Sequence, residues 1–112
     1  MNFPFRRSKY NNKKIKIDGI TFDSLKEGQR YEELKILKKK GDIEDLLCHP
    51  KFLIVINGKK VCSVLLDFSY FLVRQQETIY EDVKSKATAT AISKLKKKMC
   101  EAAHNIEIVW VY

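Results

Sequence analysis

Two residues of opposite charge, Asp82 and Lys84, lie two positions apart in the stretch IYEDVKSK, residues 79–86. Side chains of an extended strand alternate between its two faces, so Asp82 and Lys84 share one side, while Glu81 and Val83 share the other. A carboxylate can bind a divalent cation, and a neighbouring ammonium group can stabilise negative charge on a phosphate. We therefore interpret the pair as a candidate centre for metal-dependent cleavage of nucleic acid.

A second carboxylate, Asp67, follows the apolar residues 64–66. If the chain reverses direction around residues 73–77, Asp67 and Asp82 lie near each other across an antiparallel pair of strands. Two buried like charges are unfavourable unless a cation lies between them or one of them takes a proton. Hard oxygen ligands without a Cys or His cluster favour Mg²⁺ or Mn²⁺ over Zn²⁺. The alternative is a buried ion pair of Lys84 with the two aspartates, which is seldom a net stabiliser because desolvation offsets the attraction.

Glu27 is the candidate for a third oxygen ligand. On a helical wheel it falls between Tyr31 and Leu34, on the apolar stripe expected to face the sheet. The residues from Ser24 to Glu27 also fit a capping box, in which the Glu27 carboxylate accepts a hydrogen bond from the Ser24 amide. The two roles compete, and the sequence leaves both open.

Both histidines have simpler interpretations. His49 precedes Pro50 at the entry to a predicted strand and is interpreted as a turn residue rather than a general base. His104 stands at the end of a predicted helix, where a cation interacts favourably with the helix dipole.

The order of predicted elements is hairpin, helix, three strands, helix and strand, which indicates an α/β fold with a mixed sheet. The hairpin turns at Asp18-Gly19, and the first helix runs from Asp23 or Ser24 to about Lys40 and is ended by Gly41. Strands are expected at 51–57, 61–72 and 78–84, a second helix at about 88–104, and a last strand at 106–112. At 112 residues we expect a single domain, 1–112, with a basic arm at residues 1–13.

The net charge of +8 is unevenly distributed, because residues 1–16 contain six basic side chains and no acidic one. A chain this basic favours polyanions such as nucleic acid, although solubility alone is the simpler explanation. The predicted contacts to the nucleic-acid backbone are Arg6, Arg7, Lys9, Lys13, Lys14, Lys86, Lys94, Lys97 and Lys98.

The three cysteines, Cys48, Cys62 and Cys100, are far apart in the sequence and form no CxxC pair. We interpret them as reduced thiols of the core. No apolar run approaches the ~20 residues that cross a bilayer, and the first residues have no apolar signal segment. The expected location is therefore the cytoplasm.

The pattern of Glu27, Asp67 and D82-V83-K84, with the order helix–three strands–helix–strand, resembles the PD-(D/E)XK nuclease superfamily. The stretches from Ser8 to Glu27, Y31-E-E-L-K, D45-L, H49-P-K-F and E81-D-V-K are similar to small phage-encoded nucleases of the endonuclease I and Holliday-junction-resolvase type. The resemblance covers about residues 8–112. Three positions depart from the pattern: Leu66 replaces Pro, His49 stands where relatives often have Gln, and Ser85 follows the lysine in place of Gly.

The resemblance implies a restriction-endonuclease-like αβββαβ core, with two helices flanking the sheet and a short hairpin before it. It also implies an Mg²⁺- or Mn²⁺-dependent DNA endonuclease, with Asp67, Asp82 and Glu27 as metal ligands and Lys84 as the catalytic lysine. Branched DNA is the expected substrate. Resolving a four-way junction requires two coordinated cuts, so a homodimer is expected. If the chain is phage-encoded, the expected location is the cytoplasm of the host cell. The alternatives are a non-catalytic DNA-binding protein and an anti-defence protein on the same fold.

Overall fold

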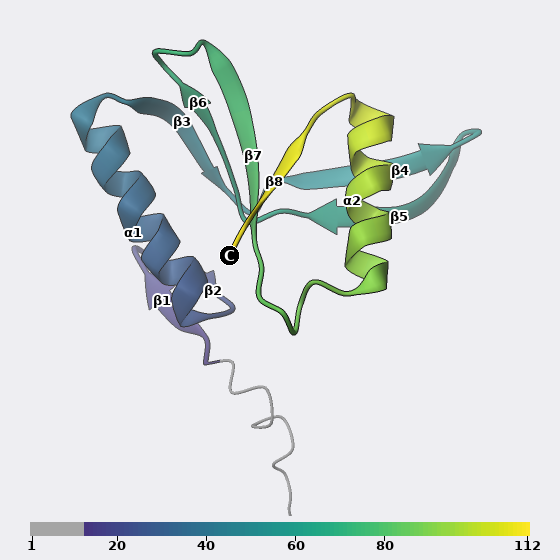
Figure 1. Cartoon of the computed structure of the whole chain (residues 1–112), viewed down its shortest axis with the longest axis horizontal. Coiled ribbons are helices and arrows are strands. Elements are labelled where there is room, and N and C mark those ends of the chain that lie inside the picture. Colours follow the sequence, from purple (N-terminus) through teal and green to yellow (C-terminus); the bar gives the residue numbers. More distant parts are fainter. Residues whose placement is uncertain (1–12) are drawn as a thin grey trace, which may run out of the picture. The chain divides into compact units, whose positions relative to one another are not determined.

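The computed structural model describes residues 13–112. The chain divides into two compact units, Met1–Ile36 and Leu37–Tyr112, and each is described here by itself. In the described part, the fold is mixed α/β with a mixed sheet and two helices (Figure 1). None of the helices among residues 13–112 is long and apolar enough to cross a membrane.

The first unit contains a hairpin, β1 (Ile15–Ile17) and β2 (Ile20–Phe22), and the start of helix α1 (Leu25–Lys40). Asp18 and Gly19 have φ values of 54° and 79°, so both turn residues are left-handed, as a type I′ turn requires. The predicted hairpin is therefore confirmed, and α1 ends as expected at Gly41, with a φ of 85°.

The hairpin and α1 approach each other closely at Gly28. A Cβ at this position would lie 3.0 Å from Cγ2 of Ile15 and 3.2 Å from Cδ1 of Ile17. Phe22 and Tyr31 are buried, with ring centroids 5.0 Å apart. Leu25 is exposed because it is the first residue of the helix.

The second unit is built on a four-stranded sheet with the order β3-β6-β7-β8. The strands are β3 (Ile43–Cys48), β6 (Phe68–Leu72), β7 (Glu77–Val83) and β8 (Ile108–Val111). The β3–β6 and β6–β7 pairs are antiparallel, and β7–β8 is parallel, because α2 (Ala91–His104) connects β7 to β8.

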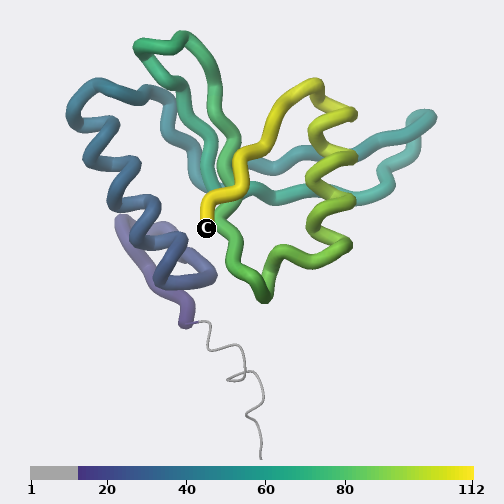
Figure 2. The backbone as a smooth tube through the Cα atoms, in the orientation of Figure 1, coloured from purple at the N-terminus to yellow at the C-terminus, as the bar shows by residue number. Residues whose placement is uncertain are grey.

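A second ladder joins β4 (Lys51–Ile56) to β5 (Lys59–Leu65) through the turn Asn57-Gly58, with φ values of 51° and 75°. The sequence prediction of one strand over 61–72 is wrong, since this stretch divides into β5 and β6, and β3 was not predicted. The chain bends between the two ladders: β3 continues into β4 and β5 continues into β6 (Figure 2). The apolar run 61–72 thus contributes to β5 in one ladder and to β6 in the other.

Helix α2 packs against the β4–β5 hairpin (Figure 1). The core of this unit is formed by five buried side chains: Ile54, Val64, Leu66, Cys100 and Ile108. The helix begins at Ala91 and not at Thr88, because Thr90 is its N-cap and the Thr90 hydroxyl accepts a hydrogen bond from the Ser93 amide at 3.1 Å. Ile92 and Leu95, in the first half of α2, are 70% and 57% exposed, since only the last two turns of the helix reach the core.

Candidate functional site

The candidate site begins at the corner where the two ladders meet. The His49 amide donates to the Asp67 carbonyl at 2.9 Å, and the Leu66 amide donates to the Pro50 carbonyl at 3.0 Å. Pro50 has no N–H to donate, and His49 has a φ of 57°, a left-handed conformation that is uncommon for a residue with a side chain. Residues held in such conformations are concentrated at functional sites. The bend thus places His49 and Asp67 side by side.

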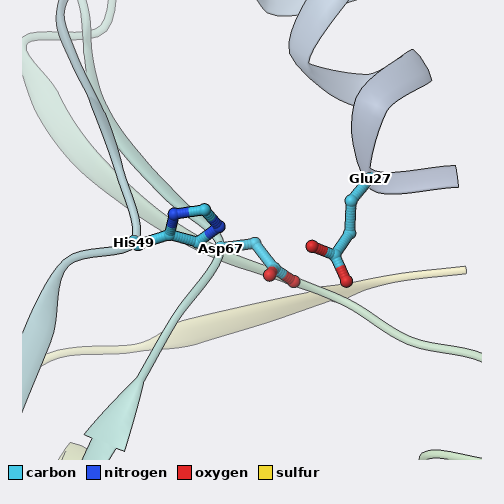
Figure 3. A group of neighbouring side chains, drawn as sticks. All are labelled: Glu27, His49 and Asp67. Atoms are coloured by element: carbon cyan, nitrogen blue, oxygen red, sulfur yellow. The ribbon is translucent and has the colours of Figure 1, made fainter. Parts of the chain in front are cut away.

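The side chains of His49 and Asp67 also lie together. A ring nitrogen of His49 and a carboxylate oxygen of Asp67 are within 4.8 Å of each other, and both side chains are half-buried (Figure 3). The Asp67 Oδ2 atom accepts a hydrogen bond from the Val83 amide at 2.6 Å. This bond fixes the carboxylate against β7, so the corner presents one imidazole and one oriented carboxylate as candidate metal ligands.

Asp82 and Lys84 share one side of β7, as the alternation of strand side chains predicts. The Lys84 Nζ atom lies 3.1 Å from Asp82 Oδ2, and the two side chains are 14% and 16% exposed. The Lys84 amide donates to the Val111 carbonyl at 2.7 Å, which fixes the end of β7 to β8. Lys84 also lies over the ring of Trp110, with Nζ 5.4 Å from its centroid. A shielded carboxylate–ammonium pair is thus held on the central strand.

Glu81 points to the opposite side, where it is 1% exposed and accepts a hydrogen bond from the Tyr70 hydroxyl. The neighbouring carboxylates of β7 therefore have different environments. Glu81 belongs to the core, and Asp82 belongs to the half-buried face that carries Lys84.

Asp67 and Asp82 are neighbours across the predicted antiparallel pair. Phe68 pairs with Glu81, and the Asp67 amide donates to the Glu81 carbonyl at 3.1 Å. Asp67 is therefore placed opposite Asp82, one step beyond the last pair of the ladder. Asp82 itself belongs to no group of three candidate ligand atoms within 4.8 Å among residues 13–112. Within the second unit, His49 is the residue that shares such a group with Asp67, and a metal-ligand role of Asp82 stays a prediction.

Glu27 belongs to the first unit, on the first turn of α1 (Figure 3). The Ser24 hydroxyl accepts a hydrogen bond from the Glu27 amide at 3.2 Å, so Ser24 caps the helix as predicted. The Glu27 carboxylate reaches back to the Asp23 amide at 3.4 Å rather than to the Ser24 amide. The Glu27 carboxylate thus caps the helix start, but the amide that donates to it belongs to Asp23, one residue earlier than predicted.

The predicted nucleic-acid contacts are distributed over several parts of the chain. Arg6, Arg7 and Lys9 lie outside the described residues. Lys14 is 3.8 Å from Asp23 in an exposed ion pair. Lys97 pairs with Glu101 at 3.1 Å and lies over the Trp110 ring at 5.8 Å. The remaining four are exposed, namely Lys13, Lys86, Lys94 and Lys98.

His49 is the candidate residue to which sequence reasoning gave no chemical role. Its interpretation as a turn residue is confirmed by its left-handed backbone. The sequence signal that could have found it is its place before Pro50, where a ladder must change direction. His49 can be recognised as a candidate metal ligand only when the second bend, at Asp67, is known to lie beside it.

A family model described as "Protein of unknown function (DUF1064)" matches residues 7–112. The chain belongs to the DUF1064 family. No curated protein and no solved structure matches it. The matched residues include Glu27, His49, Asp67, Asp82 and Lys84.

Proposed function

We propose that the protein is a metal-dependent DNA endonuclease with a restriction-endonuclease-like arrangement of its elements. The observation that carries the proposal is the corner itself: the Asp67 carboxylate is fixed by the Val83 amide and has the His49 imidazole within 4.8 Å. Asp82, which pairs with Lys84, stands on the same strand as Val83, and Lys84 follows the last residue of that strand. A metal-binding corner beside a shielded lysine is the combination that phosphodiester hydrolysis uses.

The donor atoms of the corner fit a divalent cation. Carboxylate oxygen suits Mg²⁺ and Mn²⁺, whereas imidazole nitrogen suits the transition metals. Asp67 and His49 would hold the ion, and the resemblance to PD-(D/E)XK nucleases adds the carboxylates of Asp82 and Glu27 as further ligands. A bound ion would lower the pKa of a coordinated water and neutralise charge on the phosphodiester.

Other residues of the chain hold the Asp67 carboxylate and the Lys84 ammonium group in position. The Val83 amide keeps one Asp67 oxygen in place, so the carboxylate does not need to reorganise when a ligand arrives. Lys84 is held by Asp82 and the Trp110 ring, and these contacts fix the position of its ammonium group. We assign to this ammonium the stabilisation of the negative charge that grows on the attacked phosphate. By the same resemblance, the products are a 5′-phosphate and a 3′-hydroxyl.

The resemblance also supplies the substrate class and the assembly. Branched DNA is the proposed substrate, held by lysine and arginine contacts to phosphates, and a homodimer would supply the two cuts that a four-way junction needs.

The test is cleavage of a synthetic four-way junction and of a linear duplex, each with Mg²⁺, with Mn²⁺ and with a chelator. Asp67→Asn is expected to abolish cleavage under every condition, because it removes the charge that binds the ion. Glu77→Gln is the matched control, since it removes an exposed carboxylate from β7, outside the corner. Cleavage that survives Asp67→Asn, or that proceeds equally in the chelator, would refute the proposal.

Glu27→Gln tests the ligand implied by the resemblance. Glutamine retains the backbone amide that donates to Ser24 and a side-chain oxygen that can accept from Asp23, so the helix start is preserved. A loss of cleavage that higher Mn²⁺ concentrations restore would support a role as ligand. An unchanged metal requirement would leave Glu27 as a helix cap alone.

A further inference from the structure

A cavity of about 460 Å³ adjoins the Asp82–Lys84 pair within the second unit. Its wall is formed by residues of β4, β5, β7, β8 and α2 and by Lys84 after β7. Four ammonium groups and one carboxylate line it: Lys51, Lys84, Lys96, Lys97 and Asp82. This volume lies within the range of about 300–1,000 Å³ that is typical of small-molecule sites.

Among residues 13–112, acidic partners offset only part of the positive charge of this cavity. Asp82 pairs with Lys84, and Lys97 pairs with Glu101 on its own helix. Within residues 13–112, Lys51 and Lys96 form no ion pair. They come from β4 and α2, elements far apart in the sequence, and both line the same concavity. Like charges directed into one hollow repel each other, and an anion with several oxygen atoms would relieve the repulsion.

One wall of the cavity is aromatic, and its deeper wall is apolar. Trp110 lines it beside the buried side chains of Val64, Leu66 and Ile108. Two ammonium groups, those of Lys84 and Lys97, lie 5.4 Å and 5.8 Å from the centre of the indole ring. A hollow lined by cations and by a flat ring matches a nucleotide, which has an anionic phosphate and a planar base.

We propose that this cavity is a subsite for one nucleotide of a single-stranded segment, with its phosphate on Lys51 and Lys96 and its base against Trp110. The inference rests on the proposed nuclease function and deepens it, because the cavity shares Asp82 and Lys84 with the proposed reaction centre. A base inside such a hollow cannot remain paired in a duplex. The subsite therefore selects strands with an unpaired nucleotide next to the cut, which single strands and branch points provide.

The experiment measures binding in a chelator, so that it does not depend on metal or on cleavage. The probe is an oligothymidylate, compared with a linear duplex of the same length. Trp110 is the single tryptophan of the chain, so its fluorescence reports directly on the cavity wall. We expect a saturable fluorescence change with the oligothymidylate and a much weaker one with the duplex.

Two double variants with the same loss of charge separate the cavity from general attraction. K51Q/K96Q removes the two cavity lysines, and K59Q/K60Q removes two exposed lysines that do not line the cavity. K51Q/K96Q should lower the magnitude of the slope of log K against log salt by about 1.4, at about 0.7 for each contact to a single strand. K59Q/K60Q should leave the slope unchanged, and K51R/K96R should retain it.

Trp110→Leu tests whether the base stacks against the Trp110 ring. It should weaken binding of the oligothymidylate about tenfold, with the salt slope retained, because stacking does not depend on counterion release. Trp110→Phe should keep most of the affinity and guards against a general effect on folding. Binding of these variants is followed by fluorescence anisotropy of a labelled oligonucleotide.

Three outcomes would overturn the subsite: equal slopes in the two lysine double variants, no change in Trp110 fluorescence at saturation, or equal binding of duplex and single strand. Each leaves the metal-dependent cleavage test unaffected. Conversely, a chain that binds as described but does not cut DNA would refute the nuclease and retain the nucleotide subsite.

Discussion

Two of the aspartate–lysine ion pairs within residues 13–112 have the same chemical groups and differ in their surroundings. Asp18 and Lys35, in the first unit, lie 2.6 Å apart with side chains that are 49% and 41% exposed. Asp82 and Lys84, in the second unit, lie 3.1 Å apart and are 16% and 14% exposed. The shorter ion pair is thus the more solvated one.

The partners of each pair explain the difference. Asp18 also accepts a hydrogen bond from the Tyr31 hydroxyl at 2.9 Å, so its contacts attach the hairpin turn to α1. Asp82 and Lys84 stand next to a cavity and on the strand that fixes Asp67. A pair that stabilises local structure tolerates water, whereas a pair that acts on a phosphate gains strength from the exclusion of water. Exposure and neighbours, rather than distance, separate the structural pair from the proposed catalytic pair.

The largest expected effect comes from removing one lysine of each pair. Lys84→Met should lower the cleavage rate about a hundredfold to a thousandfold, the usual loss when a charge-stabilising donor is removed. Lys35→Met should leave the rate within about twofold of wild type, since Lys35 serves the hairpin. Single-turnover cleavage with saturating Mn²⁺ measures both. Equal losses in the two variants would remove the distinction between the pairs.

The His49 side chain should decide which metal the corner prefers. His49→Ala removes an imidazole ligand and should raise the Mn²⁺ concentration needed for half-maximal cleavage by about tenfold to a hundredfold, similar to the losses seen when the ligand shell of a metal site is disturbed. His49→Gln introduces a carbonyl oxygen and should shift the preference towards Mg²⁺. Titration of both metals against the cleavage rate measures the shift. An unchanged Mn²⁺ requirement in both variants would exclude His49 as a ligand.

Glu81 and Asp82, two adjacent carboxylates of β7, also differ in their surroundings. Tyr70→Phe deletes the hydroxyl that donates to the buried Glu81 carboxylate and should lower the free energy of unfolding by about 1–3 kcal/mol. Urea denaturation measures this loss. At a temperature where the variant is folded, its cleavage rate should match that of wild type. A variant with normal stability and impaired cleavage would instead place Glu81 in the reaction.

Local patterns predicted the elements whose causes are local. The Asp18-Gly19 turn, the end of α1 at Gly41 and the common side of Asp82 and Lys84 follow from backbone preferences and strand alternation. Each of these features is determined within a few residues of the chain, so one sequence is enough to find it.

The features that the sequence did not reveal depend on pairing between distant segments. The division of the 61–72 stretch arises because β5 pairs with β4 while β6 pairs with β3 and β7, a choice that no property of the run itself encodes. His49 gains its place beside Asp67 only through the same bend. The cavity likewise requires α2 to bring Lys96 to the side of Lys51. Candidate residues were thus recognisable by type, but their grouping was not.

The smallest expected effect is the pH dependence of the Asp18–Lys35 pair. Hydrogen bonds from Lys35 and then Tyr31 lower the pKa of Asp18 below its ordinary value of 3.8, and the bond to Asp18 raises the pKa of Lys35 above 10.5. The stabilisation is therefore fully present between these two values and is lost as the pH falls through the lowered pKa of Asp18 or rises through the raised pKa of Lys35.

Asp18→Asn removes the charge but keeps a residue that accepts the left-handed turn. Its Tm should lie slightly below that of wild type at neutral pH, and the difference should shrink in acid, below pH 3.8. Because the pair is exposed to solvent, high salt should reduce the difference as well. A difference that persists unchanged in acid and in salt would mean that Asp18 acts through turn geometry, and the contrast with Asp82 would no longer concern charge.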